Sequence, residues 1–281
     1  MNTSNETIST NDFTRLQRLI YAESGIRLNG DKKTMLELRL GRRVRSLQLG
    51  SCAAYCDYLF SAEGREQEMV HFLDVVTTNK TDFFREPEHF RFLEQRALPE
   101  FCARHGLARP MTVWSAGCSS GEEPYTLAIV LSEFAVRTPG FRFRILATDL
   151  SATVLEKAQR AIYAEEAIRP VSAELRRKYF LRSRDRASSQ VRVAPELRRL
   201  VEFRRLNFKD HDYGLREKVD AFFCRNVIIY FDRATQEEIL GRISSYLLPG
   251  GYAFMGHSET LHGMQLPLEP VAPALYRRVD V

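Results

Sequence analysis

The sequence has no run of roughly 18 to 20 consecutive apolar residues, the length that a membrane-spanning helix requires. Its first ten residues are polar, whereas a signal peptide begins with basic residues and continues with apolar ones. Cysteine is scarce: there are five, an odd number, and no two form a C-x-x-C pair. Cys52 and Cys56 could share a helix face, but no second pair follows them. We therefore expect a cytoplasmic protein with reduced thiols, no membrane insertion and no metal site.

The composition is that of an ordinary folded protein. Of 281 residues, 44% are hydrophobic and 27% are charged, which excludes a disordered, collagenous or disulfide-scaffold protein. A chain of about 300 residues buries roughly three quarters of the surface that its unfolded form exposes, so it needs no metal to hold its core.

The net charge of +5 is concentrated in one segment, residues 32–45, which has six basic residues and one acidic residue. On a helix, Leu36, Leu40 and Val44 would form an apolar stripe beside a basic cluster. This surface is either solvated or a docking face for an acidic partner. Nucleic acid is not expected, because no aromatic side chains alternate with the basic ones. The candidate partner-binding residues are Lys32, Arg39, Arg42 and Arg43.

Periodicity changes along the chain. Residues 11–76 show short amphipathic helical patterns, and a further helical stretch covers residues 87–105. Strand-like runs at 111–116, 141–148, 219–224 and 251–255 then alternate with helical runs at 122–136, 153–161 and 233–247, which predicts a mostly parallel sheet covered by helices. Between them, strand-like pieces at 178–181, 190–193 and 201–206 predict a small antiparallel insertion. We expect a helical domain at 1–76, a linker at 77–108 and an α/β domain at 109–281, with the insertion at about 163–206.

The segment 113–125 runs from a strand through small residues into a helix and has three interpretations. It contains a G-x-S-x-G nucleophile elbow centred on Ser119, followed in hydrolase order by Asp149 and His257, but several strands should precede such an elbow and none does. The dinucleotide spacing G-x-G-x-x-G is absent. The methyltransferase pattern acidic-x-G-x-G-x-G fits with two substitutions, and its four places are taken by Ser115, Gly117, Ser119 and Gly121.

Asp149 ends the next predicted strand, which would deliver it to the same crevice. A carboxylate there can accept hydrogen bonds from ribose hydroxyls. It could instead cap the following helix, although Ser151 is available for that role. We favour the ribose role.

Four segments in order along the chain, residues 77–85, 117–125, 223–232 and 256–259, resemble the CheR family of chemoreceptor glutamate methyltransferases. The resemblance implies a Rossmann-like S-adenosylmethionine-dependent methyltransferase domain with a small antiparallel β-subdomain, preceded by an all-α domain. It implies transfer of the cofactor's methyl group to receptor glutamates, with S-adenosylhomocysteine as the product. It implies that Tyr230 lies beside the transferred methyl and that Arg85 lies at the cofactor mouth, where we expect Arg85 to orient the incoming carboxylate. The candidate catalytic residues are Arg85 and Tyr230, and the candidate cofactor-binding residues are Asn79, Thr81, Arg85, Gly117, Glu123, Asp149, Asn207, Phe208, Arg225 and Asn226.

The resemblance also implies partners. The helical domain would recognise the cytoplasmic methylation helices of receptors, which suits the basic segment. Some members bind a receptor's C-terminal peptide at the β-subdomain, but the loop 182–190 lacks the glycines that tethering members carry, which argues against tethering here. His257 is interpreted as structural because the reaction needs no base. The alternatives are a serine hydrolase, a regulatory module that binds the cofactor without transferring methyl, and a small-molecule methyltransferase.

Overall fold

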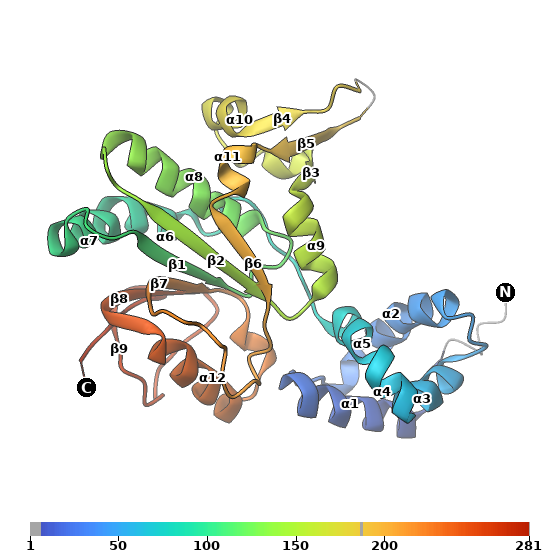
Figure 1. Ribbon diagram of the computed structural model, residues 1–281. Coiled ribbons are helices and arrows are strands. Elements are labelled where there is room, and N and C mark those ends of the chain that lie inside the picture. Colours follow the sequence, from blue (N-terminus) through green and yellow to red (C-terminus); the bar gives the residue numbers. More distant parts are fainter. Residues whose placement is uncertain (1–6, 186–187, 281) are drawn as a thin grey trace.

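The computed structural model describes residues 7–185 and 188–280 (Figure 1). Residues 1–6, which contributed to the cytoplasmic prediction, lie outside the described residues. So do Arg186 and Ala187, which belong to the loop that argued against peptide tethering. None of the described helices is long and apolar enough to cross a membrane.

Five helices form the N-terminal unit, with their apolar stripes turned inward around Leu16, Ile20, Leu36 and Phe72. Serine hydroxyls cap three of them: Ser9, Ser51 and Ser61 accept hydrogen bonds from first-turn backbone N–H groups. The helices are α1 (Thr10–Ser24), α2 (Lys33–Ser46), α3 (Cys52–Phe60), α4 (Ala62–Gln67) and α5 (Met69–Val76), with a 3₁₀ turn at Gly30–Lys32.

A seven-stranded sheet forms the centre of the second unit. Its order is β6-β2-β1-β7-β8-β10-β9, where the first five strands are parallel and β10 is antiparallel to both of its neighbours. Strand order therefore reverses on the two sides of β1, and ligands bind at the carboxyl ends of strands at such a point. The strands are β1 (Met111–Ala116), β2 (Phe143–Asp149), β6 (Val201–Arg205), β7 (Val219–Cys224), β8 (Leu247–Met255), β9 (Leu268–Ala272) and β10 (Leu275–Arg278).

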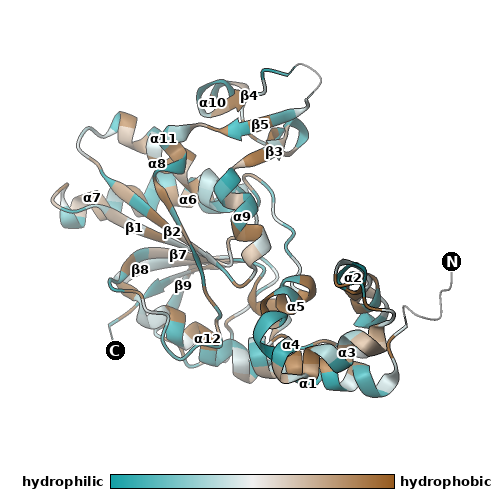
Figure 2. Ribbon diagram, turned by 45° about the vertical axis from the view of Figure 1, so that its right-hand side comes forward, coloured by the Kyte–Doolittle hydropathy of each residue, from teal (hydrophilic) through white to brown (hydrophobic). Residues whose placement is uncertain are grey.

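Helices cover both faces of this sheet, as predicted for the fold class. Strand β1 is buried along its whole length and sends alternate side chains to two cores: Met111 and Val113 to one, Trp114 and Ala116 to the other. Brown, apolar ribbon accordingly follows the central strands (Figure 2). The covering helices are α6 (Pro87–Phe92), α7 (Leu98–His105), α8 (Glu122–Arg137), α9 (Ala152–Arg160) and α12 (Arg233–Ser245), with a π-helical turn at Leu93–Ala97 between α6 and α7.

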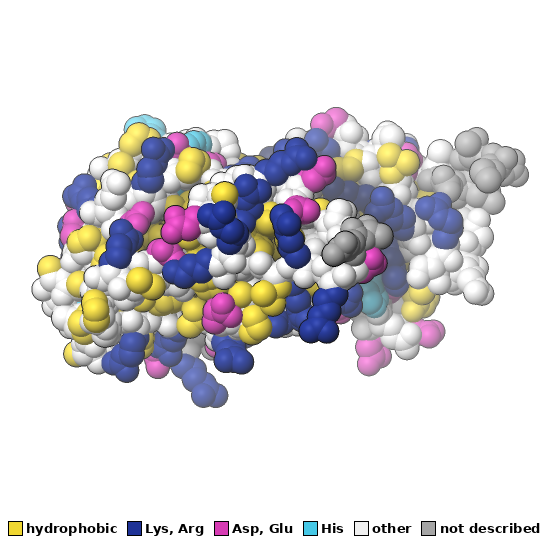
Figure 3. Space-filling view, turned by 90° about the horizontal axis from the view of Figure 1, so that it is seen from above, with side chains coloured by type: hydrophobic (Ala, Val, Ile, Leu, Met, Phe, Trp, Pro, Cys, Tyr) yellow, Lys and Arg dark blue, Asp and Glu magenta, His cyan; other side chains and the backbone are white. Residues whose placement is uncertain are grey.

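A small antiparallel sheet projects from this unit, at the end that Figure 3 views, where Lys and Arg side chains are spread over the surface. Its order is β3-β5-β4. The insertion comprises β3 (Ile162–Ala164), a 3₁₀ turn (Glu165–Ile168), α10 (Ala173–Tyr179), β4 (Phe180–Arg182), β5 (Gln190–Val193) and α11 (Pro195–Arg198).

The prediction for this insertion was wrong in two details. The piece at 201–206 is β6, which pairs in parallel with β2 in the large sheet, and the third strand of the small sheet is β3. Lys178 and Tyr179 end α10 and do not belong to a strand. Strands β9 and β10 were not predicted. A short alternating run shows that a segment is a strand, but long-range contacts decide which sheet it joins.

Candidate active site

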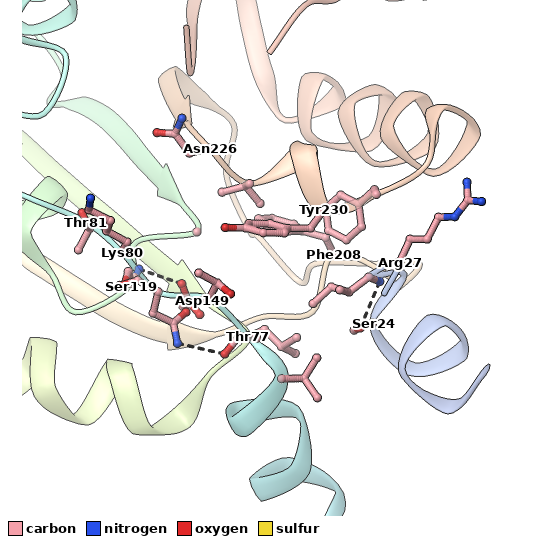
Figure 4. Close-up of a pocket in the computed structure, with 18 of the residues that line it drawn as sticks. Ser24, Arg27, Thr77, Lys80, Thr81, Ser119, Asp149, Phe208, Asn226 and Tyr230 are labelled. Carbon is pink, nitrogen blue, oxygen red and sulfur yellow. Dashed lines mark hydrogen bonds between the residues drawn. The ribbon is translucent and has the colours of Figure 1, made fainter. Parts of the chain in front are cut away.

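A cavity of about 420 Å³ lies between the helical unit and the carboxyl ends of the central strands. Three parts of the chain contribute residues to its lining: Ser24 and Arg27 come from the helical unit, Ser119 from the loop after β1 and Asp149 from the end of β2, and Asn226 and Tyr230 from the segment after β7. Figure 4 labels these six residues. Every residue that the resemblance assigned to the cofactor or the reaction lines it: Asn79, Thr81, Arg85, Gly117, Glu123, Asp149, Asn207, Phe208, Arg225, Asn226 and Tyr230. Which of them contact the cofactor stays a prediction.

The loop after β1 brings backbone close to the cavity. Gly117 has φ 90°, and its N–H donates to the carbonyl of Thr148 at 2.8 Å. A Cβ on Gly117 would lie 2.4 Å from Cγ2 of Val227. Glycine is therefore required here both by the left-handed backbone and by the lack of space.

Asp149 is the last residue of β2 and is buried, with 8% of its surface exposed. Its Oδ2 accepts from the Ser119 N–H at 2.8 Å and its Oδ1 from the Ser151 N–H at 3.0 Å. Ser151 caps α9, since its Oγ accepts from the Val154 N–H, so Asp149 is not needed as the cap. Burial raises the pKa of Asp149, and the two N–H donors partly offset this. The carboxylate keeps lone pairs for further donors at the cavity.

Glu123, in the first turn of α8, contacts Ser115, which stands where the methyltransferase pattern has an acidic residue. Ser115 occupies that strand position and donates its hydroxyl to Glu123 Oε1 at 2.6 Å. Arg225 Nε donates to the other oxygen, Oε2, at 2.7 Å. The substitution at Ser115 is thus accompanied by a carboxylate from the adjacent helix.

Arg225 lies among several acceptors. Its Nη1 donates to the carbonyl of Arg85 at 2.6 Å and lies 3.3 Å from His89 Nδ1 and 3.6 Å from Glu86 Oε2. Burial and the nearby Arg225 lower the pKa of His89 to about 3. Glu86, His89 and His257 have potential metal-ligand atoms within 4.8 Å of one another, but a cation there would face the Arg225 guanidinium, and the like charge disfavours it.

Sequence analysis missed the role of Glu259, which was given none. Its side chain accepts four backbone hydrogen bonds, from the N–H groups of Asn226, Val227, Ile228 and Gly256, at 2.7 to 2.8 Å. Asn226 has φ 58°, and these bonds hold it in that uncommon conformation. Burial raises the pKa of Glu259, which the four donors partly offset. Only its position after the glycine and histidine of the resembling segment could have pointed to it.

Ser119, Asp149 and His257 do not form the catalytic triad that the hydrolase interpretation requires. Ser119 Oγ donates to the carbonyl of Asn79 at 2.8 Å. His257 is exposed, and its backbone N–H lies 3.3 Å from Glu86. No hydrogen bond among the described residues joins His257 to Ser119 or Asp149, so Ser119 has no base.

The four candidate partner-binding residues, of which Lys32 ends the 3₁₀ turn and the other three belong to α2, divide into two groups. Arg39 donates to the carbonyls of Val75, Val76 and Thr77 at 2.7 to 3.1 Å, which satisfies the end of α5. Arg43 forms a two-pronged pair with buried Glu68 at 2.7 and 2.6 Å. Lys32 and Arg42 are exposed. All four stay predictions as partner contacts, but Arg39 and Arg43 also have partners within the domain.

The cavity lies at the carboxyl ends of two adjacent parallel strands, with a close-approach glycine after one strand and a buried aspartate at the end of the other. This arrangement defines an α/β protein of the nucleoside-binding class. The model of the family described as "CheR methyltransferase, SAM binding domain" matches residues 79–274, and that described as "CheR methyltransferase, all-alpha domain" matches residues 11–77. The chain belongs to the CheR methyltransferase family.

Several relatives are similar over nearly their whole length. The chemotaxis protein methyltransferase of Borreliella burgdorferi is 36% identical, over 98% of this chain and 96% of that protein. Chemotaxis protein methyltransferase 2 of Pseudomonas aeruginosa is 40% identical, over 88% of this chain and 86% of that protein. The chemotaxis protein methyltransferase of Escherichia coli is 40% identical, over 92% and 87%.

Proposed function

We propose that this chain transfers the methyl group of S-adenosylmethionine to glutamate side chains in the cytoplasmic methylation helices of chemotaxis receptors. The products are glutamate methyl esters and S-adenosylhomocysteine, and the reaction serves adaptation in chemosensory signalling. The family match and the names of the relatives support this proposal.

The observation that carries the proposal is the separation of charge in the cavity. Glu123 and Asp149 are buried, with 7% and 8% of their surface exposed. Arg225 is buried in its pair with Glu123, but the other basic lining residues are more exposed: Arg27, Lys32 and Lys80 reach solvent, while Arg39 and Arg85 are half-buried. Buried carboxylates suit a positively charged sulfonium cofactor, and basic groups nearer solvent suit an incoming carboxylate.

The residues present fit such a cofactor. Asn226 lines the cavity, and its Oδ1 is buried with no hydrogen-bond partner among the described residues, which leaves an acceptor for a ligand donor. Asp149 would accept the ribose hydroxyls, and Glu123 and Arg225 would hold the methionine portion. Asn79, Thr81, Asn207 and Phe208 would enclose the rest.

The reaction needs little acid–base chemistry. A glutamate side chain, with an ordinary pKa near 4.3, is already ionised at neutral pH and needs no general base. The bound cofactor supplies a methyl group on positive sulfur: an oxygen–carbon bond to the glutamate forms as the carbon–sulfur bond breaks, and that electron pair leaves with the sulfur. The protein has to align the two groups and exclude water, which can contribute about 7 to 11 kcal/mol.

Arg85 and Tyr230 would do the aligning. Arg85 Nη1 donates to the carbonyl of Lys80 at 2.9 Å, and its remaining donors can bind the substrate carboxylate. The Tyr230 side chain lines the cavity, and its backbone carbonyl accepts from the Arg27 N–H at 2.8 Å. We assign Tyr230 to shaping the methyl-transfer pocket.

The test is transfer of radiolabelled methyl from S-adenosylmethionine to receptor-containing membranes, followed by alkaline release of volatile methanol. Base-labile label in receptor bands supports the proposal, because methyl esters hydrolyse and N-methyl groups do not. Binding of the cofactor without any transfer indicates a regulatory module instead, and label on small molecules alone indicates a small-molecule methyltransferase.

Variants test the assigned residues. Losing a charge-assisted hydrogen bond should lower kcat/KM roughly 10- to 100-fold in Arg85→Ala. Arg91→Ala is the matched control, because Arg91 is exposed and pairs with Glu88 on its own helix. If Arg85→Ala and Tyr230→Phe both leave kcat/KM unchanged, these two roles are wrong.

A further inference from the structure

The start of helix α9 receives a carboxylate from the helical unit. Asp74, in the last turns of α5, accepts at Oδ1 from the Ala152 N–H at 2.9 Å. Its Oδ2 accepts from the Thr153 N–H at 3.1 Å and the Thr153 hydroxyl at 2.7 Å. The first N–H groups of a helix have no partner within it, so Asp74 supplies from another domain part of the cap that α9 needs.

The turn that Asp74 fixes leads directly from Asp149. Ser151, whose N–H donates to Asp149 Oδ1 at 3.0 Å, immediately precedes the two residues that Asp74 binds. Leu150, which stands between Asp149 and Ser151, packs against the apolar core of the helical unit. The helical unit thus holds the whole turn from Asp149 to Thr153.

Asp74 is also connected to Ser119, the second residue that binds the Asp149 carboxylate, through a chain of hydrogen bonds. Its backbone carbonyl accepts from the Thr77 hydroxyl at 3.0 Å, and Thr77 Oγ1 accepts from Asn79 Nδ2 at 3.0 Å. The Asn79 carbonyl accepts from Ser119 Oγ at 2.8 Å. Figure 4 shows Thr77, Ser119 and Asp149 close together.

We propose that Asp74 is a positioning residue for the cofactor: by capping α9 across the domain boundary, it fixes the direction of the Asp149 carboxylate and makes cofactor affinity depend on the helical unit. The inference rests on the proposed function, in which Asp149 accepts the ribose hydroxyls. The Asp74 charge is one of the causes that raise the pKa of Asp149, so removing it would by itself favour the ionised acceptor. A loss of affinity on removal must therefore come from lost positioning.

The experiment is calorimetric titration of the full chain with S-adenosylhomocysteine. Asp74→Ala should raise the Kd about 5- to 10-fold, the size of a lost helix cap. Asp57→Ala removes an exposed acidic residue of the same unit and should leave the Kd unchanged. Because Asp74 acts through Asp149, adding Asp74→Ala to Asp149→Asn should raise the Kd much less than it does in the wild-type background. Thermal unfolding is recorded for each variant.

The outcomes separate this inference from the proposed function. Additive effects in the double variant, or an unchanged Kd with only a lower Tm, would overturn the positioning role while leaving the function intact. A wild-type chain that binds no S-adenosylhomocysteine would overturn both. If Asp74→Ala does not fold, Asp74→Asn replaces it, because it keeps one acceptor oxygen. The same comparison with and without Asp149→Asn should then show a smaller rise in Kd.

Discussion

Glu123 and Arg225 form a buried ion pair between residues 102 positions apart in the chain, with Arg225 Nε 2.7 Å from Glu123 Oε2. Their side chains are 8% and 2% exposed. The pair joins the helix after β1 to the segment after β7, so it fixes two walls of the cavity relative to each other.

Glu123→Gln should lower the free energy of unfolding by about 3 kcal/mol, because it removes the carboxylate nearest to the buried Arg225 charge and leaves Glu86, at 3.6 Å. Urea denaturation measures the change. The double variant Glu123→Gln/Arg225→Met should lose less than the two single variants together. Glu88→Gln breaks an exposed pair with Arg91 and is the control, with a change below about 1 kcal/mol. If the double variant lost as much free energy of unfolding as the two single variants together, the pairing of Glu123 with Arg225 would be contradicted.

Gly117→Ala should weaken cofactor binding more than 10-fold, because an alanine at this position would strain the loop by roughly 1 to 3 kcal/mol. The new Cβ would meet Val227 Cγ2 at 2.4 Å, and the backbone would stay at positive φ. Gly30→Ala is the control, since nothing lies within 4 Å of its Cβ position and its φ is not positive. Calorimetry with S-adenosylhomocysteine measures both. An unchanged Kd for Gly117→Ala would show that the loop moves freely.

Cofactor affinity should fall as the solution becomes acidic. Burial raises the pKa of Asp149, and a protonated carboxyl accepts ribose hydroxyls less well than the ionised form. Affinity should therefore decline as pH falls through this raised pKa. The stability of the cofactor-free protein has the opposite sign: the folded state binds this proton more tightly than the unfolded state, so the Asp149 contribution favours folding at low pH and is lost as pH rises.

Titrations with S-adenosylhomocysteine between about pH 4 and 8 measure the affinity. Asp149→Asn should bind more weakly at neutral pH and show a flatter profile. Glu122→Gln is the control, because burial also raises the pKa of Glu122, whose Oε2 accepts from the Ser120 hydroxyl. If Glu122→Gln flattens the profile and Asp149→Asn does not, Asp149 is not the titrating group.

Features encoded by neighbouring residues could be predicted from the sequence, and features that depend on long-range contacts could not. Strand β1 and the turn at Gly117 follow from adjacent residues, and the predicted bounds of β1 and β7 agree with the structure. By contrast, β6 was assigned to the wrong sheet because its partner β2 lies more than 50 residues away.

The supports of the site were missed for the same reason. Glu259 binds backbone N–H groups more than 30 residues distant, and Asp74 binds a helix start 78 residues distant. Neither residue type nor local spacing signals such a contact. The basic cluster on α2 shows the converse: helical spacing predicted one face, but the acceptors at Glu68 and at the end of α5 separate Arg39 and Arg43 from their exposed neighbours.

Arg42 and Arg43 differ in their surroundings, so charge reversal at each can distinguish a loss of receptor binding from a loss of stability. Arg42 is exposed, whereas Arg43 is paired with Glu68, whose side chain is 2% exposed and also accepts from the Tyr55 hydroxyl at 3.0 Å. Arg43→Glu would place two carboxylates together and should lower the free energy of unfolding by about 3 kcal/mol. Thermal and urea unfolding measure this loss.

Arg42→Glu should leave stability and the Kd for S-adenosylhomocysteine unchanged and raise the KM for receptor roughly 2- to 5-fold, because an exposed charge contributes modestly to an interface. The rise should shrink as salt is added, since exposed charges are screened over about 8 to 10 Å at moderate ionic strength. Methyl transfer to receptor membranes at two salt concentrations measures it. A folded Arg42→Glu variant with normal receptor KM at low salt would show that the exposed face of α2 does not contact the receptor.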